Sequence, residues 1–223
     1  MGSCPLCGHA PLRRFYHRGV RDPAPGDYLR CPACALILLT PRAWPDLESE
    51  QRWYRTHEND PEDPGYRRFL QRLTEPLTRT CPPPAAGLDW GSGPRPALAS
   101  ELRQRGYAVA LYDPVFGPTQ APGGPFDFIT CTEALEHFHR PLDELHAMQA
   151  RLRPGGILAI MSGWPPEAAG FHRWHYRRDP THVAFYGPET LRWIARRFGW
   201  DLQLPVRDVV LFRAPPSPIL EER

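Results

Sequence analysis

The pattern that most limits the possible folds lies after Ala86, where short apolar segments alternate with stretches of helical periodicity. Such alternation is typical of a parallel sheet with helices packed on it. Pro141 and Pro188 each begin a helical stretch, since proline is favoured in the first turn of a helix. The sequence therefore predicts an α/β fold. We expect strands at 87–90, 108–112, 126–131 and 157–162, and a last antiparallel pair at 201–204 and 209–213.

Four cysteines near the N-terminus form two matched pairs, Cys4 with Cys7 and Cys31 with Cys34, each separated by two residues. Two C-x2-C turns supply the four sulfur ligands of a closed, structural zinc site. Gly8 follows the first pair and can adopt the positive φ that such turns use. Disulfide pairing is the alternative, but the absence of an export signal favours a metal. We therefore expect a small zinc ribbon over residues 1–40.

The remaining chain divides at a run of prolines. Residues 41–84 carry two helical patterns with aromatic anchors and end at the prolines 82–84, which cannot continue a helix. We interpret this region as a helical linker or lid and assign residues 85–223 to the main α/β domain. A chain of 223 residues is long enough for this arrangement.

Composition limits the partners. The formal net charge is +2 and every basic side chain other than histidine is arginine, so no overall field attracts nucleic acid. No apolar run approaches the length that spans a membrane. We expect a cytoplasmic protein with a small-molecule substrate and without nucleic acid or membrane as partner. The sequence leaves the oligomeric state open.

A glycine turn follows the first predicted strand of the main domain. Gly91 and Gly93 let the backbone turn sharply and approach a ligand, and Asp113 ends the next strand, where it can bind ribose hydroxyls. A dinucleotide would need a third glycine, and Pro94 and Pro96 remove amide donors from the turn. A cofactor with a ribose but no phosphate fits better, and S-adenosylmethionine (SAM) is the common one.

Four motifs then occur in one order: LDWGSG, LYDP, FDFITCTEALEHF and LRPGGILAIMS. With them the chain resembles a class I SAM-dependent methyltransferase over residues 86–213, and the cysteine module resembles the zinc-ribbon heads of some bacterial members, including certain sugar methyltransferases. The resemblance implies a Rossmann-like methyltransferase sheet with helices on both faces. It also implies that the cofactor is bound by Asp89, Gly91, Ser92, Gly93, Asp113, Pro114, Cys131, Thr132 and Glu133.

Two departures from the family pattern change the expected sheet and pocket. Arg95 stands where the family has its third glycine. Only 12 residues separate Asp113 from Phe126, and this interval is rich in proline and glycine, so it cannot hold a helix and a strand. We predict a somewhat reduced sheet, with one strand missing or vestigial, and a more open adenine pocket.

Candidate catalytic residues follow the third motif. Glu136 and His137 come directly after a cofactor-facing strand, and His137 titrates in the range of a general base. The alternative is that this Glu-His pair only orients a loop. His182 is a third candidate, in a later segment.

That later segment, residues 170–188, is rich in aromatic, arginine and histidine residues that could bind a ring or an anion. The substrate-binding candidates are Trp174, Tyr176, Arg177 and His182. The alternative is an aromatic lid, in which Trp174 and Tyr186 pack on the core and Asp179 pairs with Arg177 or Arg178. A second metal site from His172, His175 and His182 is not expected, because these histidines lack a carboxylate at a recognised spacing.

The sequence therefore predicts an enzyme that transfers a methyl group from SAM to a small polar metabolite, such as a sugar or a related compound. Two alternatives stay open. One is a non-catalytic module that binds SAM or its product and docks a partner through the zinc ribbon. The other is an RNA methyltransferase, which the small net charge disfavours.

Overall fold

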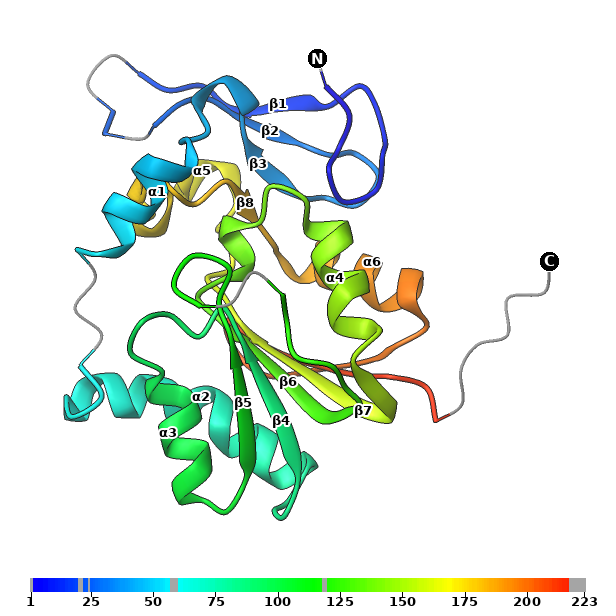
Figure 1. Ribbon diagram of the computed structural model, residues 1–223. Helices are drawn as coiled ribbons and strands as arrows, with labels where there is room; N and C mark the ends of the chain where they lie inside the picture. The colour runs from blue at the N-terminus through cyan, green and yellow to red at the C-terminus, as the bar shows by residue number, and fades with distance from the viewer. Residues whose placement is uncertain (1, 20–21, 24, 57–59, 118–119, 217–223) are drawn as a thin grey trace. The chain divides into compact units, whose positions relative to one another are not determined.

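The computed structural model describes all residues except 1, 20–21, 24, 57–59, 118–119 and 217–223 (Figure 1). Its contacts divide the chain into two compact units. Unit 1 comprises Met1–His57, Leu135–Leu145 and Ser162–Trp193, and unit 2 comprises Glu58–Ala134, His146–Met161 and Ile194–Arg223. The predicted borders at 40 and 84 stay a prediction, since the compact units are drawn differently.

Unit 2 is built on a six-stranded sheet in the order β5-β4-β6-β7-β10-β9. Strands β5, β4, β6 and β7 are parallel, whereas β10 is antiparallel to both of its neighbours. The predicted α/β class with a final antiparallel pair is therefore confirmed. The strands are β4 (Ala86–Trp90), β5 (Ala108–Tyr112), β6 (Phe126–Thr132), β7 (Leu152–Met161), β9 (Asp201–Val206) and β10 (Val209–Arg213).

Helices pack on both faces of this sheet. Helices α2 (Pro64–Thr80) and α3 (Ala97–Gln104) lie on one face (Figure 1). Their leucines are buried in one cluster with Phe128 and Leu211. Adjacent strand residues point to opposite faces, so Phe212 lies on the other side, where its ring contacts Trp200 at 5.4 Å. Trp200 in turn stacks on Phe198, in the last turn of α6 (Pro188–Phe198). Residues 146–149 of α4 (Pro141–Gln149) also belong to this unit.

The shortened interval after Asp113 forms no strand in the residues that are described, 114–117 and 120–125. Its start is a tight turn, in which the Gly117 amide donates to the Asp113 carbonyl at 2.9 Å. Strand β5 is consequently the edge of the sheet. This confirms the prediction of a reduced sheet.

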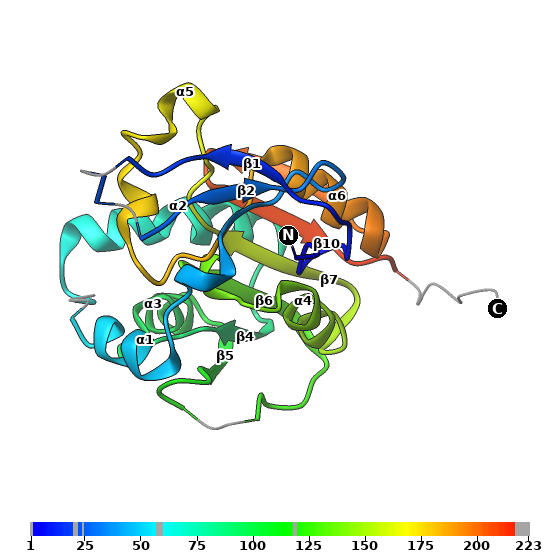
Figure 2. The ribbon, with the colours of Figure 1, turned by 90° about the horizontal axis from the view of Figure 1, so that it is seen from above.

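Unit 1 contains a four-stranded antiparallel sheet in the order β1-β2-β3-β8, of which β1 and β2 are labelled side by side in Figure 2. The strands are β1 (Arg13–Tyr16), β2 (Tyr28–Arg30), β3 (Ile37–Leu39) and β8 (Ala184–Phe185). The helices of the unit are α1 (Leu47–Tyr54), α5 (Ala168–Phe171), the first turns of α4 and α6, and the 3-10 turns η1 (Pro41–Ala43), η2 (Leu135–His137) and η3 (His175–Arg178). Thus α1 belongs to unit 1, whereas α2 belongs to unit 2.

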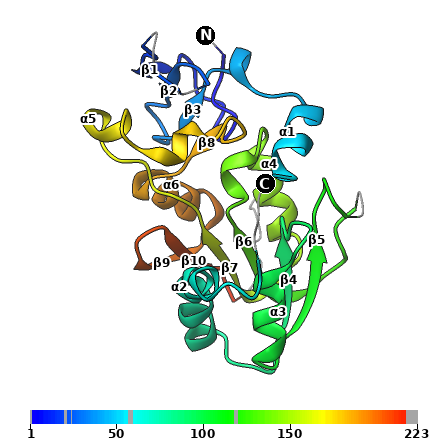
Figure 3. The same ribbon diagram turned by 90° about the vertical axis from the view of Figure 1, so that its left-hand side faces the viewer.

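An aromatic core joins the N-terminal ribbon to the distant segment 163–187. Phe171 is fully buried, and its ring lies 4.9 Å from Tyr28, 5.1 Å from Phe15 and 5.4 Å from Tyr16. Strand β8 completes the sheet by pairing with β3 (Figure 3). The two segments are therefore parts of one folded unit. Within the part of the chain that the structure describes, no helix is long and apolar enough to cross a membrane.

Candidate cofactor and catalytic sites

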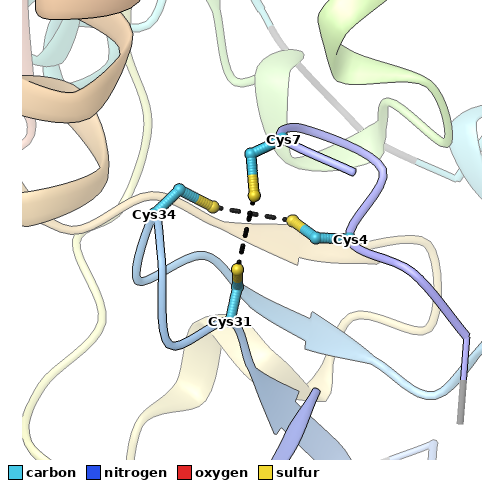
Figure 4. A group of neighbouring side chains, drawn as sticks. All are labelled: Cys4, Cys7, Cys31 and Cys34. Carbon is cyan, nitrogen blue, oxygen red and sulfur yellow. Dashed lines mark hydrogen bonds between the residues drawn. The ribbon is translucent and has the colours of Figure 1, made fainter. Parts of the chain in front are cut away.

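The four N-terminal cysteines converge, with their sulfur atoms pointing toward one another (Figure 4). Cys4 Sγ lies 3.5 Å from Cys34 Sγ, and Cys7 Sγ lies 3.5 Å from Cys31 Sγ. Sulfur atoms that share a tetrahedral zinc at about 2.3 Å lie about 3.8 Å apart. All four cysteines are free, so the alternative of disulfide pairing is not formed. The geometry supports the predicted structural zinc site.

Both C-x2-C turns have the same backbone. The amide of Gly8 donates to the Cys4 carbonyl at 2.8 Å, and the amide of Ala35 donates to the Cys31 carbonyl at 2.9 Å. Gly8 and Ala35 both have positive φ, at 75° and 60°. Burial raises the pKa of the Cys7 thiol to about 12, so a bound cation would be needed to hold it as a thiolate at neutral pH.

In unit 2, the glycine turn after β4 is fixed to the end of β5. The amides of Gly91 and Ser92 donate to the Tyr112 carbonyl at 2.8 and 3.2 Å. Gly91 and Gly93 have φ of 76° and 65°. A Cβ on Gly91 would lie 2.6 Å from the Ala134 side chain, whereas a Cβ on Gly93 would meet nothing within 4 Å. The backbone at Gly93 therefore borders open space, as a loop that binds a ligand requires.

The Asp113 carboxylate holds this turn together. Its Oδ2 accepts from the Gly93 amide at 2.8 Å, and its Oδ1 accepts from the amides of Val115 and Phe116 at 2.8 and 2.9 Å. A carboxylate has about four acceptor positions, so one position remains for a ribose hydroxyl. Pro114 and Arg95 are exposed, so the side chain at the position of the third motif glycine projects into solvent.

Asp89 lies one position before the end of β4 and is 3% exposed. Its Oδ1 accepts from the Thr130 hydroxyl at 2.8 Å. Burial raises the pKa of Asp89 from 3.8 to about 6. A buried carboxylate of this kind is suited to a nearby cationic group, because a cation would stabilise its ionised form.

The raised pKa of Asp89 has a consequence for stability. Between pH 3.8 and about 6 the folded state binds more protons than the unfolded state, so the free energy of unfolding falls as pH rises. The full effect is about 3 kcal/mol. We expect Asp89→Asn, whose amide oxygen can still accept from Thr130, to lack this decrease. Urea denaturation of the cofactor-free protein between pH 4 and 7 measures it, and parallel pH profiles for the two proteins would contradict the prediction.

The end of β6 provides the third part of the predicted cofactor site. Cys131 is buried, Thr132 is half-buried, and Glu133 has a φ of 49°, an uncommon value for a residue with a Cβ. The Glu133 amide donates to the Met161 carbonyl at 2.8 Å. Sequence reasoning missed Tyr66 on α2, whose pKa is raised to about 12 by burial and by the nearby charges of Asp89 and Glu133.

In unit 1, the three candidate catalytic residues come together. Glu136, His137 and His182 can each offer one polar atom, and these atoms lie within 4.8 Å of one another. The rings of His137 and His182 are 4.7 Å apart. The grouping brings a buried carboxylate and two imidazoles from η2 and from the segment before β8 into one site.

Hydrogen bonds fix the orientation of all three side chains. His137 Nδ1 lies 3.0 Å from the Thr181 carbonyl, and His182 Nδ1 lies 2.7 Å from the Tyr176 carbonyl. Because a carbonyl only accepts, each Nδ1 carries the proton and each Nε2 keeps a lone pair in the neutral ring. Glu136 accepts from the Ser162 hydroxyl at 2.8 Å and from the Tyr176 hydroxyl. Burial lowers the pKa of His182.

The residues of the segment 170–188 differ in whether they lie near the candidate catalytic group or pack in the aromatic core. Tyr176 and His182 lie in the group just described. Trp174 is half-buried, and its ring packs against Phe185 at 5.0 Å and Tyr176 at 5.2 Å. His172 and His175 are exposed, and neither belongs to a group of converging metal ligands in the part of the chain that the structure describes.

Arg177 does not fit its predicted role in substrate binding. It is 1% exposed, and its guanidinium donates to both oxygens of Asp22 at 2.8 and 3.1 Å. It also donates to the carbonyls of Phe171 and His172. The donors of the Arg177 guanidinium are therefore used inside the aromatic core, which corrects the prediction that Arg177 binds substrate. Asp179, which the alternative of an aromatic lid paired with Arg177 or Arg178, accepts from the Trp53 indole and from the Thr181 amide, both at 2.8 Å.

Solved structures with a similar fold are methyltransferases. A chain in the complex of the Trm112 methyltransferase activator with a methyltransferase from Haloferax volcanii is 14% identical, with a TM-score of 0.52 over 74% of this chain and 97% of that one. Magnesium protoporphyrin IX methyltransferase from Synechocystis PCC 6803, with bound S-adenosylhomocysteine (SAH), is 12% identical, with a TM-score of 0.53 over 75% and 94%. No curated protein matches the sequence.

The family itself is shown by the sequence. The model of the methyltransferase domain family matches residues 63–204, which is more than half of the chain. The match starts at the residue before α2 and ends within β9, so it includes α2, which the sequence analysis placed in the linker. It also includes the glycine turn, the end of β6 and the three residues Glu136, His137 and His182. The chain therefore belongs to the methyltransferase domain family and is a class I SAM-dependent methyltransferase.

Proposed function

We propose that the chain binds SAM at the glycine turn of unit 2 and transfers its methyl group to a small polar metabolite. The observation that carries the cofactor part is the glycine turn, whose open Gly93 is fixed to the Asp113 carboxylate at the carboxyl ends of β4 and β5. Asp113 would accept from one ribose hydroxyl, and the turn would pass the methionine part. The proposed cofactor contacts are Asp89, Gly91, Ser92, Gly93, Asp113, Pro114, Cys131, Thr132 and Glu133.

Two residues of the proposed acceptor site follow closely in sequence on the carboxyl ends of sheet strands. Glu136 follows the last residue of β6 by four residues, and Ser162 directly follows the last residue of β7. Ligands in open α/β sheets bind at these carboxyl ends of the strands. This order along the chain supports a role of Glu136, His137 and His182 at the reacting atom of the acceptor.

The transfer itself needs positioning and the removal of one proton. A hydroxyl or amine of the acceptor would give its proton to the Nε2 lone pair of His137, whose ring is oriented by the Thr181 carbonyl. The acceptor atom would form a bond to the methyl carbon, and the carbon–sulfur bond would break with its electron pair moving to sulfur, which yields SAH. Glu136 would stabilise the protonated imidazole.

The surroundings favour a small polar acceptor. Tyr176 and Trp174 present half-buried aromatic rings, and Glu136 and His182 provide polar atoms close to Tyr176. Apolar ring faces next to hydrogen-bonding groups suit a sugar or a similar ring compound. The net charge of +2 gives no general attraction for RNA.

Titration calorimetry with SAH tests the cofactor site. We expect micromolar binding by the wild type and binding weakened at least tenfold in Asp113→Ala, because a hydrogen bond to a charged group contributes about 1.5–3 kcal/mol. Asp127→Ala is the matched control, since Asp127 also accepts from a backbone amide, that of Ala86 at 2.7 Å, but at the opposite end of the sheet. Equal binding by wild type and Asp113→Ala would refute the assignment.

Incubation of the wild-type protein with SAM and a cell extract distinguishes the small-molecule enzyme from a non-catalytic module and from an RNA methyltransferase. SAH binding without methyl transfer to any fraction of a cell extract would favour the non-catalytic module. Transfer that disappears after ribonuclease treatment of the extract would favour an RNA acceptor, whereas transfer that survives it supports a small acceptor.

A further inference from the structure

Glu136, His137 and His182 form the second of two groups in the described residues whose side chains converge as metal ligands do, the first being the four cysteines. Their atoms lie within 4.8 Å of one another, although Glu136 and His137 are neighbours in sequence and His182 is distant. His182 Nε2 lies 3.8 Å from Glu136 Oε1. This distance is too long for a hydrogen bond.

The spacing is close to that of ligands around one ion. Two ligand atoms bound at about 2.1 Å to the same metal lie about 3.0–3.4 Å apart at octahedral or tetrahedral angles. Small side-chain rotations would bring the 3.8 Å pair to this separation. After such rotations one cation could contact both atoms.

The hydrogen bonds that hold the three candidate ligands in place are also those expected of a metal site. Histidines that bind a metal through one nitrogen donate the other N–H to a carbonyl or carboxylate, and metal-binding carboxylates are themselves hydrogen-bonded. His137 and His182 donate Nδ1–H to the carbonyls of Thr181 and Tyr176 and keep their Nε2 lone pairs. Glu136 accepts from Ser162 and Tyr176. All three ligands are therefore oriented before any ion binds.

We propose that Glu136, His137 and His182 bind a divalent transition-metal ion in unit 1, separate from the cysteine site. Two imidazoles and one carboxylate suit Mn²⁺, Fe²⁺ or Zn²⁺ and disfavour Ca²⁺ and Mg²⁺, which take oxygen ligands. Three protein ligands leave at least one position for water or for an oxygen atom of the acceptor.

This inference rests on the proposed function and changes one role within it. A metal ion lowers the pKa of a bound hydroxyl, so the acceptor would release its proton to solvent water before its oxygen attacks the methyl group. His137 would then be a ligand and not a base, because its single Nε2 lone pair cannot serve both. The acceptors favoured by such a site are compounds that offer a hydroxyl oxygen to the metal.

Zinc loading tests the site without an activity measurement. Protein that carries one zinc per chain is titrated with Zn²⁺ by calorimetry, and bound zinc is counted after gel filtration. We expect a second zinc in the wild type and at least tenfold weaker binding of it in His137→Ala, His182→Ala and Glu136→Gln. Ser162→Ala, which leaves all three ligands, should weaken it about tenfold. His175→Ala, which removes an exposed histidine of the same segment, should bind it like the wild type.

Each outcome decides the inference. A wild type that binds only one zinc up to millimolar Zn²⁺ would overturn it, and this result needs no variant to fold. A second zinc that persists unchanged in His137→Ala and His182→Ala with native circular dichroism would also overturn it. SAH titration of the same samples shows whether the proposed cofactor site stands when the metal site does not.

Discussion

Replacement of Cys31 by serine should release zinc from the N-terminal cluster and unfold the β2–β3 hairpin of unit 1. Cys31 directly follows β2, and its amide donates to the Leu36 carbonyl at 2.8 Å, just before β3 begins. The second C-x2-C turn is therefore the loop of this hairpin. Structural zinc contributes about 10–16 kcal/mol in small zinc modules, whereas strands of three residues have little stability of their own.

Metal analysis and far-ultraviolet circular dichroism measure this effect. Cys81→Ser is the matched control, because Cys81 is a half-buried free cysteine in unit 2 that lies outside the cluster. We expect the control to keep one zinc per chain and the wild-type spectrum. If Cys31→Ser retained its zinc and its spectrum, the cysteine cluster would not be a zinc site that holds unit 1 together.

The sheet of unit 2 was predictable because its strands carry local signals. The apolar runs 108–112 and 209–213 match β5 and β10 to the residue. Strand β7 (Leu152–Met161) begins five residues before the strand predicted at 157–162 and includes Pro154, Gly155 and Gly156. Pairing shifts from Phe126 opposite Leu152 to Phe128 opposite Ile157, so these three residues form a bulge inside the strand.

The arrangement of unit 1 could not be predicted in the same way. Strand β8 has two residues, too few for a periodic pattern, and it pairs with a strand almost 150 residues earlier in the chain. Nothing local indicates that pairing. Glu136 and His137 were selected for their chemistry and their place after a strand, and His182 for its chemistry, whereas their neighbour Ser162 gave no signal in the sequence.

Arg177 shows where local reasoning gives a wrong partner. Asp179 is two residues away and was the partner of Arg177 or Arg178 in the alternative of an aromatic lid, but the folded chain pairs Arg177 with Asp22. The side chain of Arg177 is 1% exposed and that of Asp22 is 9% exposed. Arg177 also lies against the rings of Tyr16 and Phe171, at 5.1 and 5.7 Å from their centroids. A buried guanidinium of this kind holds the ribbon to the segment 163–187.

Arg177→Met should therefore lower the free energy of unfolding by about 3–5 kcal/mol, because the buried negative charge of Asp22 would lose the guanidinium that neutralises it. The control is Arg178→Met, which removes the neighbouring exposed arginine and should change stability by less than about 0.5 kcal/mol. Denaturant unfolding followed by tryptophan fluorescence measures both, since Trp174 packs in the same aromatic cluster.

A double variant separates loss of the ion pair from loss of packing. Replacing Asp22 by asparagine together with Arg177→Met removes the buried charge that Arg177→Met alone leaves behind. We expect the double variant to recover part of the lost stability, because the buried charge that has lost its guanidinium is the costly group. If Arg177→Met kept full stability and bound the acceptor more weakly, Arg177 would be a substrate-binding residue. The buried pair with Asp22 would then contribute nothing to the stability of unit 1.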